Sequence, residues 1–358
     1  RKSLPLAREY GLEHGQDYRI LNSQGGHYSN ITNLSLLGVN LRRKVIRIRI
    51  DSNNEMDMHD LERQLRACFQ LGCVVPTIML TMGTTDTFGV DRVQPVVEIR
   101  DRLCAEFEVA VKPHIHVDSA IGWPLIFFAG YDFDRNPLRI NAATLPSLRR
   151  HVDRFGELRH ADSFTVDFQK WGYVPYTSSL VMIRDRTDLD ALAHDPDNFS
   201  YFDRDIEGRG HLHSTIECSR GAAGVFGAAA AMQHLGADGY RRLIVNSLHN
   251  ANYFRFRLSG LPGVVIPAAQ NQGPSVGFRL YDPTAVSDPE AEFQAECGLD
   301  AAGGRLDRNS RFHRANFVSR GKRGLYTNWI EALAFGAYDQ LGRSRRIPGE
   351  KAVFFNPH

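Results

Sequence analysis

Hydrophobic and polar residues alternate along the first half of the chain in a pattern that predicts strands and helices in turn. The segment 44–50 (KVIRIRI) alternates apolar and basic residues as a strand does, and 60–72 has helical spacing that ends at a glycine. A strand over 74–83, a helix over 93–109 and a strand over 114–120 follow. This order predicts an α/β fold with a mostly parallel sheet, in which ligands bind beyond the carboxyl ends of the strands.

The middle of the chain predicts a hairpin followed by a long helix. Two short strands, 162–167 and 178–185, are spaced like a hairpin pair rather than a strand-helix-strand unit. A helix that begins with an alanine-rich stretch is expected from 221 to 258. We therefore place a large domain over residues 1–258.

The remaining residues, 259–358, predict a smaller α+β domain. Strand-like patterns occur at 261–268 and 275–282. The glycine- and arginine-rich segment 300–311 is typical of a mobile loop, or of a place where residues are missing from the sequence.

Composition and charge predict a soluble globular protein without a nucleic-acid partner. The 358 residues are 42% hydrophobic, and 43 basic residues against 41 acidic ones give a formal charge of +2. The sequence shows no membrane-spanning stretch and no signal-peptide apolar segment, so we expect a cytosolic protein. The five cysteines lack CxxC spacing and predict neither a disulfide framework nor a zinc site.

Three polar motifs follow predicted strands. MGTTDTFGVD places Thr84 and Thr85 at a strand exit, where hydroxyls bind an anionic oxygen or cap a turn. HVDSAIGW places Asp118 after an apolar strand, where a buried carboxylate needs a cation or hydrogen-bond donors. FQKWGY places Lys170 among aromatic residues, as the partner of that carboxylate, a Schiff-base lysine or a surface residue.

A metal site is an alternative for the second motif. Strand alternation puts His114, His116 and Asp118 on one face, and HxHxD resembles the start of a ligand set in binuclear hydrolases. That family has a histidine directly after the aspartate, whereas this chain has Ser119. At this point the motifs are compatible both with a metal-dependent hydrolase and with a function that uses Lys170.

Together the motifs resemble those of the pyridoxal-phosphate-dependent group II decarboxylases, which include aromatic amino acid, histidine and glutamate decarboxylases. GTTDTFGVD, HVDSAIGW and DSFTVDFQKWGYVPYTSSLVM occur in the family's order, and Asp118 and Lys170 are 52 positions apart. The resemblance extends from about Gly15 to at least Arg242. It implies fold type I, as in aspartate aminotransferase, with a seven-stranded mostly parallel sheet. It also implies pyridoxal 5'-phosphate as cofactor and decarboxylation of an L-amino acid to its amine.

The resemblance implies roles for single residues. Lys170 would form the Schiff base with the aldehyde of the cofactor, and Asp118 would keep the ring nitrogen protonated. Thr85 matches the position that bonds the phenolic oxygen, and Ala120 matches the small residue on which the ring packs. His27, in GGHYSN, matches the histidine that stacks on the ring.

Two positions affect what the resemblance implies about cofactor binding and product. Gln169 stands where the family usually has a histidine that contacts the phosphate, so cofactor affinity or the pH profile is expected to differ. Tyr201, in the polar segment 194–210, is the candidate for the tyrosine that protonates the substrate carbon after carbon dioxide leaves. Its neighbour Phe202 leaves an aldehyde product open, because phenylalanine at the tyrosine's position has that effect in family members.

The substrate side chain is not fixed by these motifs. Trp123 and Phe127, in GWPLIFFAG, are expected either in a pocket for an aromatic or branched aliphatic side chain or in the core.

The site is expected to need more than this chain. Only 26 residues precede His27, and none of them forms a convincing phosphate-binding segment. We therefore expect a C-terminal portion of a longer protein, an obligate homodimer, and a companion chain that completes the site. The alternatives are an aldehyde synthase or carbon–carbon lyase with the same cofactor, the metal hydrolase, and a non-catalytic partner subunit.

Overall fold

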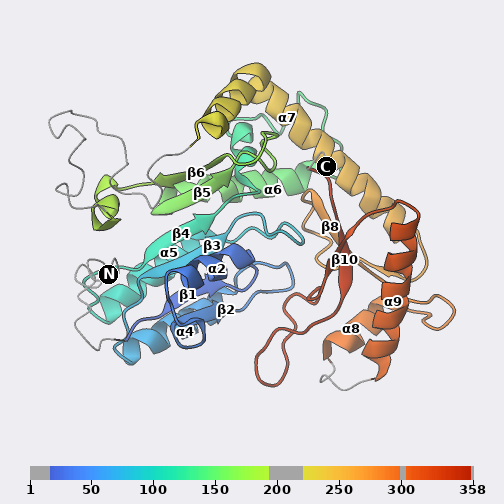
Figure 1. Cartoon of the computed structure of the whole chain (residues 1–358), viewed down its shortest axis with the longest axis horizontal. Coiled ribbons are helices and arrows are strands. Elements are labelled where there is room, and N and C mark those ends of the chain that lie inside the picture. Colours follow the sequence, from blue (N-terminus) through green and yellow to red (C-terminus); the bar gives the residue numbers. More distant parts are fainter. Residues whose placement is uncertain (1–16, 193–220, 299–303, 356–358) are drawn as a thin grey trace.

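The computed structural model describes residues 17–192, 221–298 and 304–355, and its large domain is built on one mixed sheet (Figure 1). The strand order is β2-β1-β3-β4-β5-β6, parallel from β2 to β5, with β6 antiparallel to β5. The strands are β1 (Ile20–Ser23), β2 (Val45–Ile48), β3 (Thr77–Thr81), β4 (His114–Asp118), β5 (Ser163–Asp167) and β6 (Ser179–Ile183).

The mostly parallel sheet and the hairpin-like pairing of the last two strands are confirmed. The seven strands implied by the resemblance are corrected to six within the described residues. The seventh strand came from the resemblance alone, because no hydrophobic pattern in this sequence predicts it. β6 therefore lies at an edge of the described sheet (Figure 1).

Helices flank this sheet, and α4 shows how the sequence forms them. The Asp57 side chain accepts from the backbone N–H groups of His59 and Asp60 at the start of α4, and the apolar face of the helix is buried. No helix in the described part of the chain is long and apolar enough to cross a membrane. The helices are α2 (Tyr28–Leu36), α3 (Leu41–Lys44), α4 (Met58–Gln70), α5 (Val93–Glu106) and α6 (Leu145–Phe155), with 3-10 helices η1 (Trp123–Phe128), η2 (Gly156–His160) and η3 (Arg186–Leu192).

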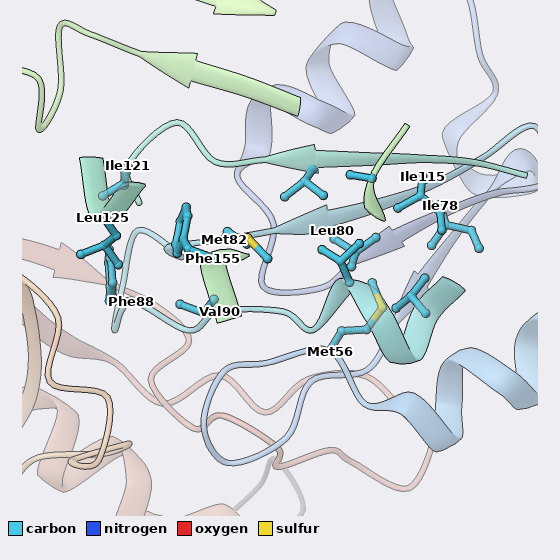
Figure 2. Close-up of a cluster of buried hydrophobic side chains, with 14 of the residues drawn as sticks. Met56, Ile78, Leu80, Met82, Phe88, Val90, Ile115, Ile121, Leu125 and Phe155 are labelled. Atoms are coloured by element: carbon cyan, nitrogen blue, oxygen red, sulfur yellow. The ribbon is translucent and has the colours of Figure 1, made fainter. Parts of the chain in front are cut away.

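The main core lies against the central strands (Figure 2). Ile78 and Leu80 of β3 and Ile115 of β4 have no exposed surface. Polar residues at the alternate positions of β4 are only half-buried. Strand alternation therefore leaves the carboxylate of Asp118 at the end of a buried strand.

A long helix, α7 (Ala223–Ser259), joins the large domain to a second sheet, in agreement with the predicted helix over 221–258. The helix is interrupted at Gly236, which has a positive φ of 59°. The second sheet is antiparallel, in the order β7-β8-β10-β9. Its elements are β7 (Val264–Val265), β8 (Ser275–Leu280), β9 (Asn328–Ile330) and β10 (Gly349–Val353), with α8 (Pro289–Gly298) and α9 (Gly304–Lys322).

The mobile loop predicted over 300–311 is wrong from residue 304 onward, where α9 begins. Its polar residues contact α8: Arg305 pairs with Glu292 at 3.4 Å, and Asn309 donates to Glu296 at 2.9 Å. The polar residues that suggested a loop therefore make contacts between α9 and α8.

Candidate active site

Lys170 lies in the turn between β5 and β6, and aromatic residues hold the backbone of this turn. Trp123 Nε1 donates to the backbone carbonyl of Asp167 at 2.9 Å. Tyr240 OH donates to the carbonyl of Gly172 at 3.0 Å. These bonds fix the turn on both sides of the lysine.

The neighbours of Lys170 in sequence belong to the core. Trp171 has no exposed surface, and its Nε1 donates to Ser247 Oγ at 3.3 Å. A Cβ at Gly172 would lie 2.5 Å from the carbonyl oxygen of Phe168, so only glycine fits there. The aromatic residues around Lys170 therefore shape the turn.

Trp123 and Phe127 are also core residues. Trp123 is 6% exposed, and Phe127 stacks on Tyr240 with ring centroids 4.3 Å apart. Neither lines the cavity beside Lys170. Of the two expectations for these aromatics, the substrate pocket is wrong and the core is confirmed.

Lys170 faces a cavity of about 860 Å³ that residues of both domains line. His27, Thr85 and Ile121 line it from the large domain. The small domain contributes two cations, Arg320 and Lys351. Much of the remaining wall is apolar and comes from α7 and the second sheet: Phe254, Leu258, Phe278, Leu280 and Val353.

The carboxylate of Asp118 lies at the carboxyl end of β4. Its Oδ1 accepts from the backbone N–H of Ala120 at 3.2 Å. Within the described ranges no cation forms an ion pair with this carboxylate. Lys170, one of the partners considered from the sequence, pairs instead with Asp167, with 3.0 Å between Nζ and Oδ2. Asp118 thus keeps an acceptor for a positively charged N–H.

His27 caps the start of α2 and lines the cavity. Its Nδ1 accepts from the backbone N–H of Ser29, which leaves the proton of the neutral ring on Nε2. Partial burial and then the charge of Lys170 lower the pKa of His27 from its usual value. An uncharged imidazole is therefore expected beside the lysine at neutral pH.

Two adjacent threonines have different surroundings. Thr84 Oγ1 accepts from Gly89 N at 2.7 Å and from Asn54 Nδ2 at 3.0 Å, and the residue is 1% exposed. Thr84 therefore holds the loop, whereas Thr85 lines the cavity.

Lys351 is a cavity residue that the sequence did not single out. Its Nζ lies 3.0 Å from Asp86 Oδ1 and 3.4 Å from the carbonyl oxygen of Thr85. It comes from β10, a short strand for which the sequence analysis predicted no element. A lysine within an apolar run near the end of the chain, EKAVFF, is the signal that could have found it.

The other sequence candidates lie elsewhere. Gln169 is 9% exposed and uses its amide on β6: Oε1 accepts from Ser178 N at 2.8 Å, and Nε2 donates to Ser179 Oγ at 3.0 Å. Ala120 follows the cavity-side strand end but is not among the residues that line the cavity. Tyr201 and Phe202 lie outside the described residues.

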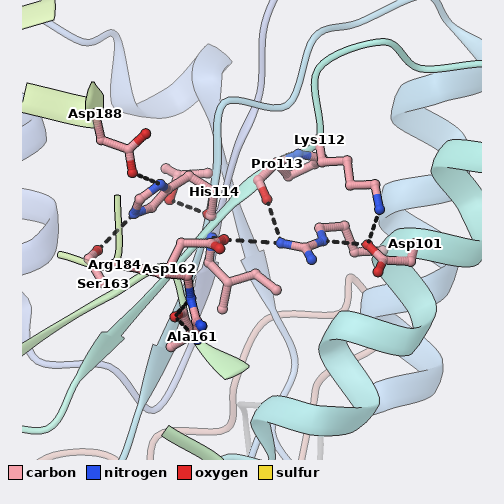
Figure 3. Close-up of polar contacts among 12 residues, drawn as sticks. Asp101, Lys112, Pro113, His114, Ala161, Asp162, Ser163, Arg184 and Asp188 are labelled. Atoms are coloured by element: carbon pink, nitrogen blue, oxygen red, sulfur yellow. Dashed lines mark hydrogen bonds and ion pairs between the residues drawn. The ribbon is translucent and has the colours of Figure 1, made fainter. Parts of the chain in front are cut away.

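The two histidines of the metal alternative share a serine, and Figure 3 shows the contact between His114 and Ser163. His114 Nε2 and His116 Nδ1 lie 2.8 and 2.7 Å from Ser163 Oγ. His114 Nδ1 lies 3.7 Å from Asp188 Oδ2. No group of three or more histidine, cysteine or acidic residues is placed to hold a metal ion in the part of the chain that the structure describes. The described residues therefore contain no set of ligands that would support a metal-dependent hydrolase.

Comparisons with known proteins connect this chain to amino acid decarboxylases. No protein-family model matches it. It is 27% identical over 248 residues to an L-2,4-diaminobutyrate decarboxylase of Rhizobium meliloti (strain 1021), a match that covers 69% of this chain and 43% of that protein. It is 25% identical over 253 residues to an L-tyrosine decarboxylase of Enterococcus faecalis (strain ATCC 700802 / V583), covering 64% and 39%.

A solved structure has a similar fold. The crystal structure of Oryza sativa TDC with PLP and tryptamine has a TM-score of 0.71 and 17% identity, covering 98% of this chain and 61% of that one. This chain spans about two fifths of the length of the two curated relatives. Its homologues are amino acid decarboxylases, and its own fold is fold type I of the pyridoxal-phosphate-dependent decarboxylases.

Proposed function

We propose that this chain carries the lysine and the ring-binding residues of a pyridoxal-phosphate-dependent L-amino acid decarboxylase, which converts an amino acid to its amine and carbon dioxide. The observation that carries the proposal is the shared cavity of His27, Thr85 and Lys170, with Asp118 at the end of a neighbouring strand. Three separate sequence motifs meet there. The names of the decarboxylase relatives support the same reaction.

The donor set fits the cofactor in part. Lys170 offers a primary amine, Asp118 an acceptor for a pyridinium N–H, and Thr85 a hydroxyl for the phenolic oxygen. Gln169 is bound to β6, so we assign the phosphate to groups other than its amide. When bound, pyridoxal phosphate supplies an aldehyde for the substrate amine and a ring that takes up electrons as carbon dioxide leaves.

The residues of this chain have distinct tasks. Lys170 would supply the amine for the aldehyde of the cofactor, and Asp118 would keep the ring nitrogen protonated. His27, uncharged and in the cavity wall, would be the residue that packs on the ring, and Ala120 would be the small residue opposite it. Tyr201, outside the described residues, is the proposed acid that protonates the substrate carbon.

Lys351 is the proposed contact for the substrate carboxylate. It lies in the cavity wall next to Thr85, and an ammonium attracts a carboxylate in a partly buried site. Both cations in the wall have a carboxylate partner, but Asp86 beside Lys351 is 38% exposed to water, whereas Glu350 beside Arg320 is fully buried and binds its cation more strongly. The apolar wall formed by Phe254 and its neighbours favours an aromatic or branched aliphatic substrate side chain.

We also propose partners for this chain. β6 presents Leu180, Val181 and Met182 at 43 to 52% exposure, although these residues point alternately to both faces of the sheet. Within the described residues β6 has a partner strand on one side only, and a strand edge with apolar residues on both faces favours pairing with another strand. We assign that strand to a companion polypeptide from outside residues 1–358, which would also supply phosphate-binding groups.

A second copy of the chain is the other proposed partner. α2 leaves large apolar side chains uncovered, with Leu36 81% and Tyr28 73% exposed. Because His27 caps this same helix, a homodimer across α2 would bring the two sites close to their interface.

The test is an absorbance spectrum of the chain with pyridoxal phosphate, before and after borohydride, followed by peptide mapping. The expected result is a band that borohydride removes and a pyridoxyl group on Lys170. Lys170→Ala should abolish it, and Lys112→Ala, which changes a lysine 53% exposed at the surface, should not. A pyridoxyl group spread over surface lysines, with no preference for Lys170, would contradict the proposal.

A further inference from the structure

Four polar side chains form a line from Gln169 to Lys170 by way of β5 and β6. Gln169 Nε2 donates to Ser179 Oγ at 3.0 Å, and Ser179 Oγ donates to Asp167 Oδ1 at 2.6 Å. The second carboxylate oxygen, Asp167 Oδ2, lies 3.0 Å from Lys170 Nζ. Asp167 thus has one oxygen on a hydroxyl and the other on the lysine.

A backbone N–H group decides which atoms donate and which accept in this series of hydrogen bonds. Ser178 N donates to Gln169 Oε1 at 2.8 Å, so the amide nitrogen of Gln169 faces Ser179. Because Ser179 Oγ accepts that N–H, its own proton is available for Asp167. Both oxygens of Asp167 therefore act as acceptors, as those of an ionised carboxylate do.

The backbone holds Asp167 in place, whereas the lysine can move. Asp167 pairs with Ser179 in the ladder of β5 and β6, and its carbonyl accepts from Trp123 Nε1. Lys170 has a flexible aliphatic stem and faces the cavity. The ammonium can therefore swing into the cavity while the carboxylate stays at the wall.

We propose that Asp167 is a positioning residue, which holds the charged ammonium of Lys170 at the cavity wall until a carbonyl group is bound. This inference rests on the proposed role of Lys170. An ammonium has no lone pair, so Nζ must release one proton to water before it can attack a carbonyl carbon. The ion pair with Asp167 keeps Nζ at the cavity wall, so the amine reaches a carbonyl carbon only after this contact breaks.

Other charges around the cavity act less directly on Lys170. Its two other cations have partners of their own, Asp86 for Lys351 and Glu350 for Arg320. The carboxylate in ion-pair contact with the lysine is that of Asp167. Besides Lys170, the charged or titratable residues that line this cavity, within the described ranges, are His27, Tyr176, Arg320, Tyr326 and Lys351, and Asp118 acts on His27 from the end of β4.

The test measures the rate of reductive methylation of Lys170 by formaldehyde and cyanoborohydride at one fixed pH, by mass spectrometry of peptides. Asp167→Asn should raise the rate at Lys170 about tenfold, because the ion pair that holds the ammonium at the wall is gone. Ser179→Ala should lower the rate, because a carboxylate with one donor fewer binds the ammonium more strongly. Lys112, which pairs with Asp101 at 3.1 Å on the surface, is the internal control, and its rate should not change.

Equal methylation rates at Lys170 in the wild type and Asp167→Asn would overturn the proposal, as would an equal change of rate at Lys112. If Asp167→Asn does not fold, Ser179→Ala decides, and a rate at Lys170 that is unchanged or higher counts against the proposal. The outcomes for the two proposals are distinguishable. A missing pyridoxyl group contradicts the proposed function and leaves the methylation rates as expected, whereas an unchanged rate in Asp167→Asn contradicts the role of Asp167 and leaves the pyridoxyl group in place.

Discussion

The indole N–H of Trp123 donates to the backbone carbonyl of Asp167 at 2.9 Å, three residues before the lysine at the cavity wall. Trp123 lies in η1, just after β4, the strand that ends at Asp118. One buried side chain thus connects the segment after Asp118 to the turn that carries Lys170. The geometry of both groups depends on this contact.

Trp123→Phe should lower the free energy of unfolding by about 2 kcal/mol, because it removes a buried hydrogen bond and part of a packed ring. Trp329→Phe is the control, since its N–H bonds the side chain of Glu331 near the surface and should cost less than about 1 kcal/mol. Urea unfolding measures both. Equal losses in the two variants would contradict a special role for Trp123.

Gly172→Ala should destabilise the chain by about 1 to 3 kcal/mol, because the new methyl group would overlap the carbonyl of Phe168 and the ring of Trp123. Gly156→Ala has nothing within 4 Å of its new methyl group and a φ of −58°, so it should be neutral or slightly stabilising. Thermal and urea unfolding of the pair would show opposite signs. A neutral Gly172→Ala would mean that the turn relaxes at little cost.

His151→Leu should reduce the sensitivity of the fold to acid. Burial, with the charges of Arg150 and Arg154, lowers the pKa of His151 to about 3 from 6.5. The unfolded chain binds this proton at a higher pH than the folded one, so stability falls as the pH falls from 6.5 toward 3.

In the leucine variant the free energy of unfolding should lack this dependence on pH, which reaches about 1.4 kcal/mol per pH unit for one group. Urea unfolding at several pH values measures it, and His59→Gln, an exposed position, is the control. An unchanged slope in His151→Leu would assign the acid sensitivity to other groups.

Asp118→Asn should lower decarboxylation at least about 100-fold in any preparation of this chain that is active, because a neutral amide does not stabilise a protonated ring nitrogen. The pyridoxyl group on Lys170 after borohydride should persist. Asp185→Asn, an exposed aspartate, should leave the rate unchanged. Carbon dioxide release from a panel of amino acids measures the rate. Activity within a few-fold of the wild type would contradict the assignment of Asp118.

Tyr201→Phe should lower amine formation by about 100- to 10,000-fold and raise the share of aldehyde, because it removes the proposed acid. Phe202→Tyr is the matched variant at the neighbouring position. Chromatography of the products measures the ratio of amine to aldehyde. If only Phe202→Tyr changes that ratio, the catalytic position is Phe202 and the aldehyde reaction is favoured.

The local pattern of the sequence was sufficient for most elements of the large domain. β3 and α4 each bury one face, so the spacing of their apolar residues records the type of element. β1 and β10 were missed because they bury polar residues, Asn22 and Ser23 in β1 and Glu350 in β10, so neither shows an apolar period. α9 was missed because its polar residues pair with α8, which a composition cannot show.

The sequence by itself determined five of the six described strands of the large sheet, the strand end that carries Asp118, and the turn that carries Lys170. Only the tertiary structure decided which groups share the cavity. It separated Thr85 from Thr84 and brought Lys351 within 3.4 Å of a carbonyl oxygen 266 positions away. The physical reason is that periodicity records which face of an element is buried, whereas packing between distant elements decides what that face meets.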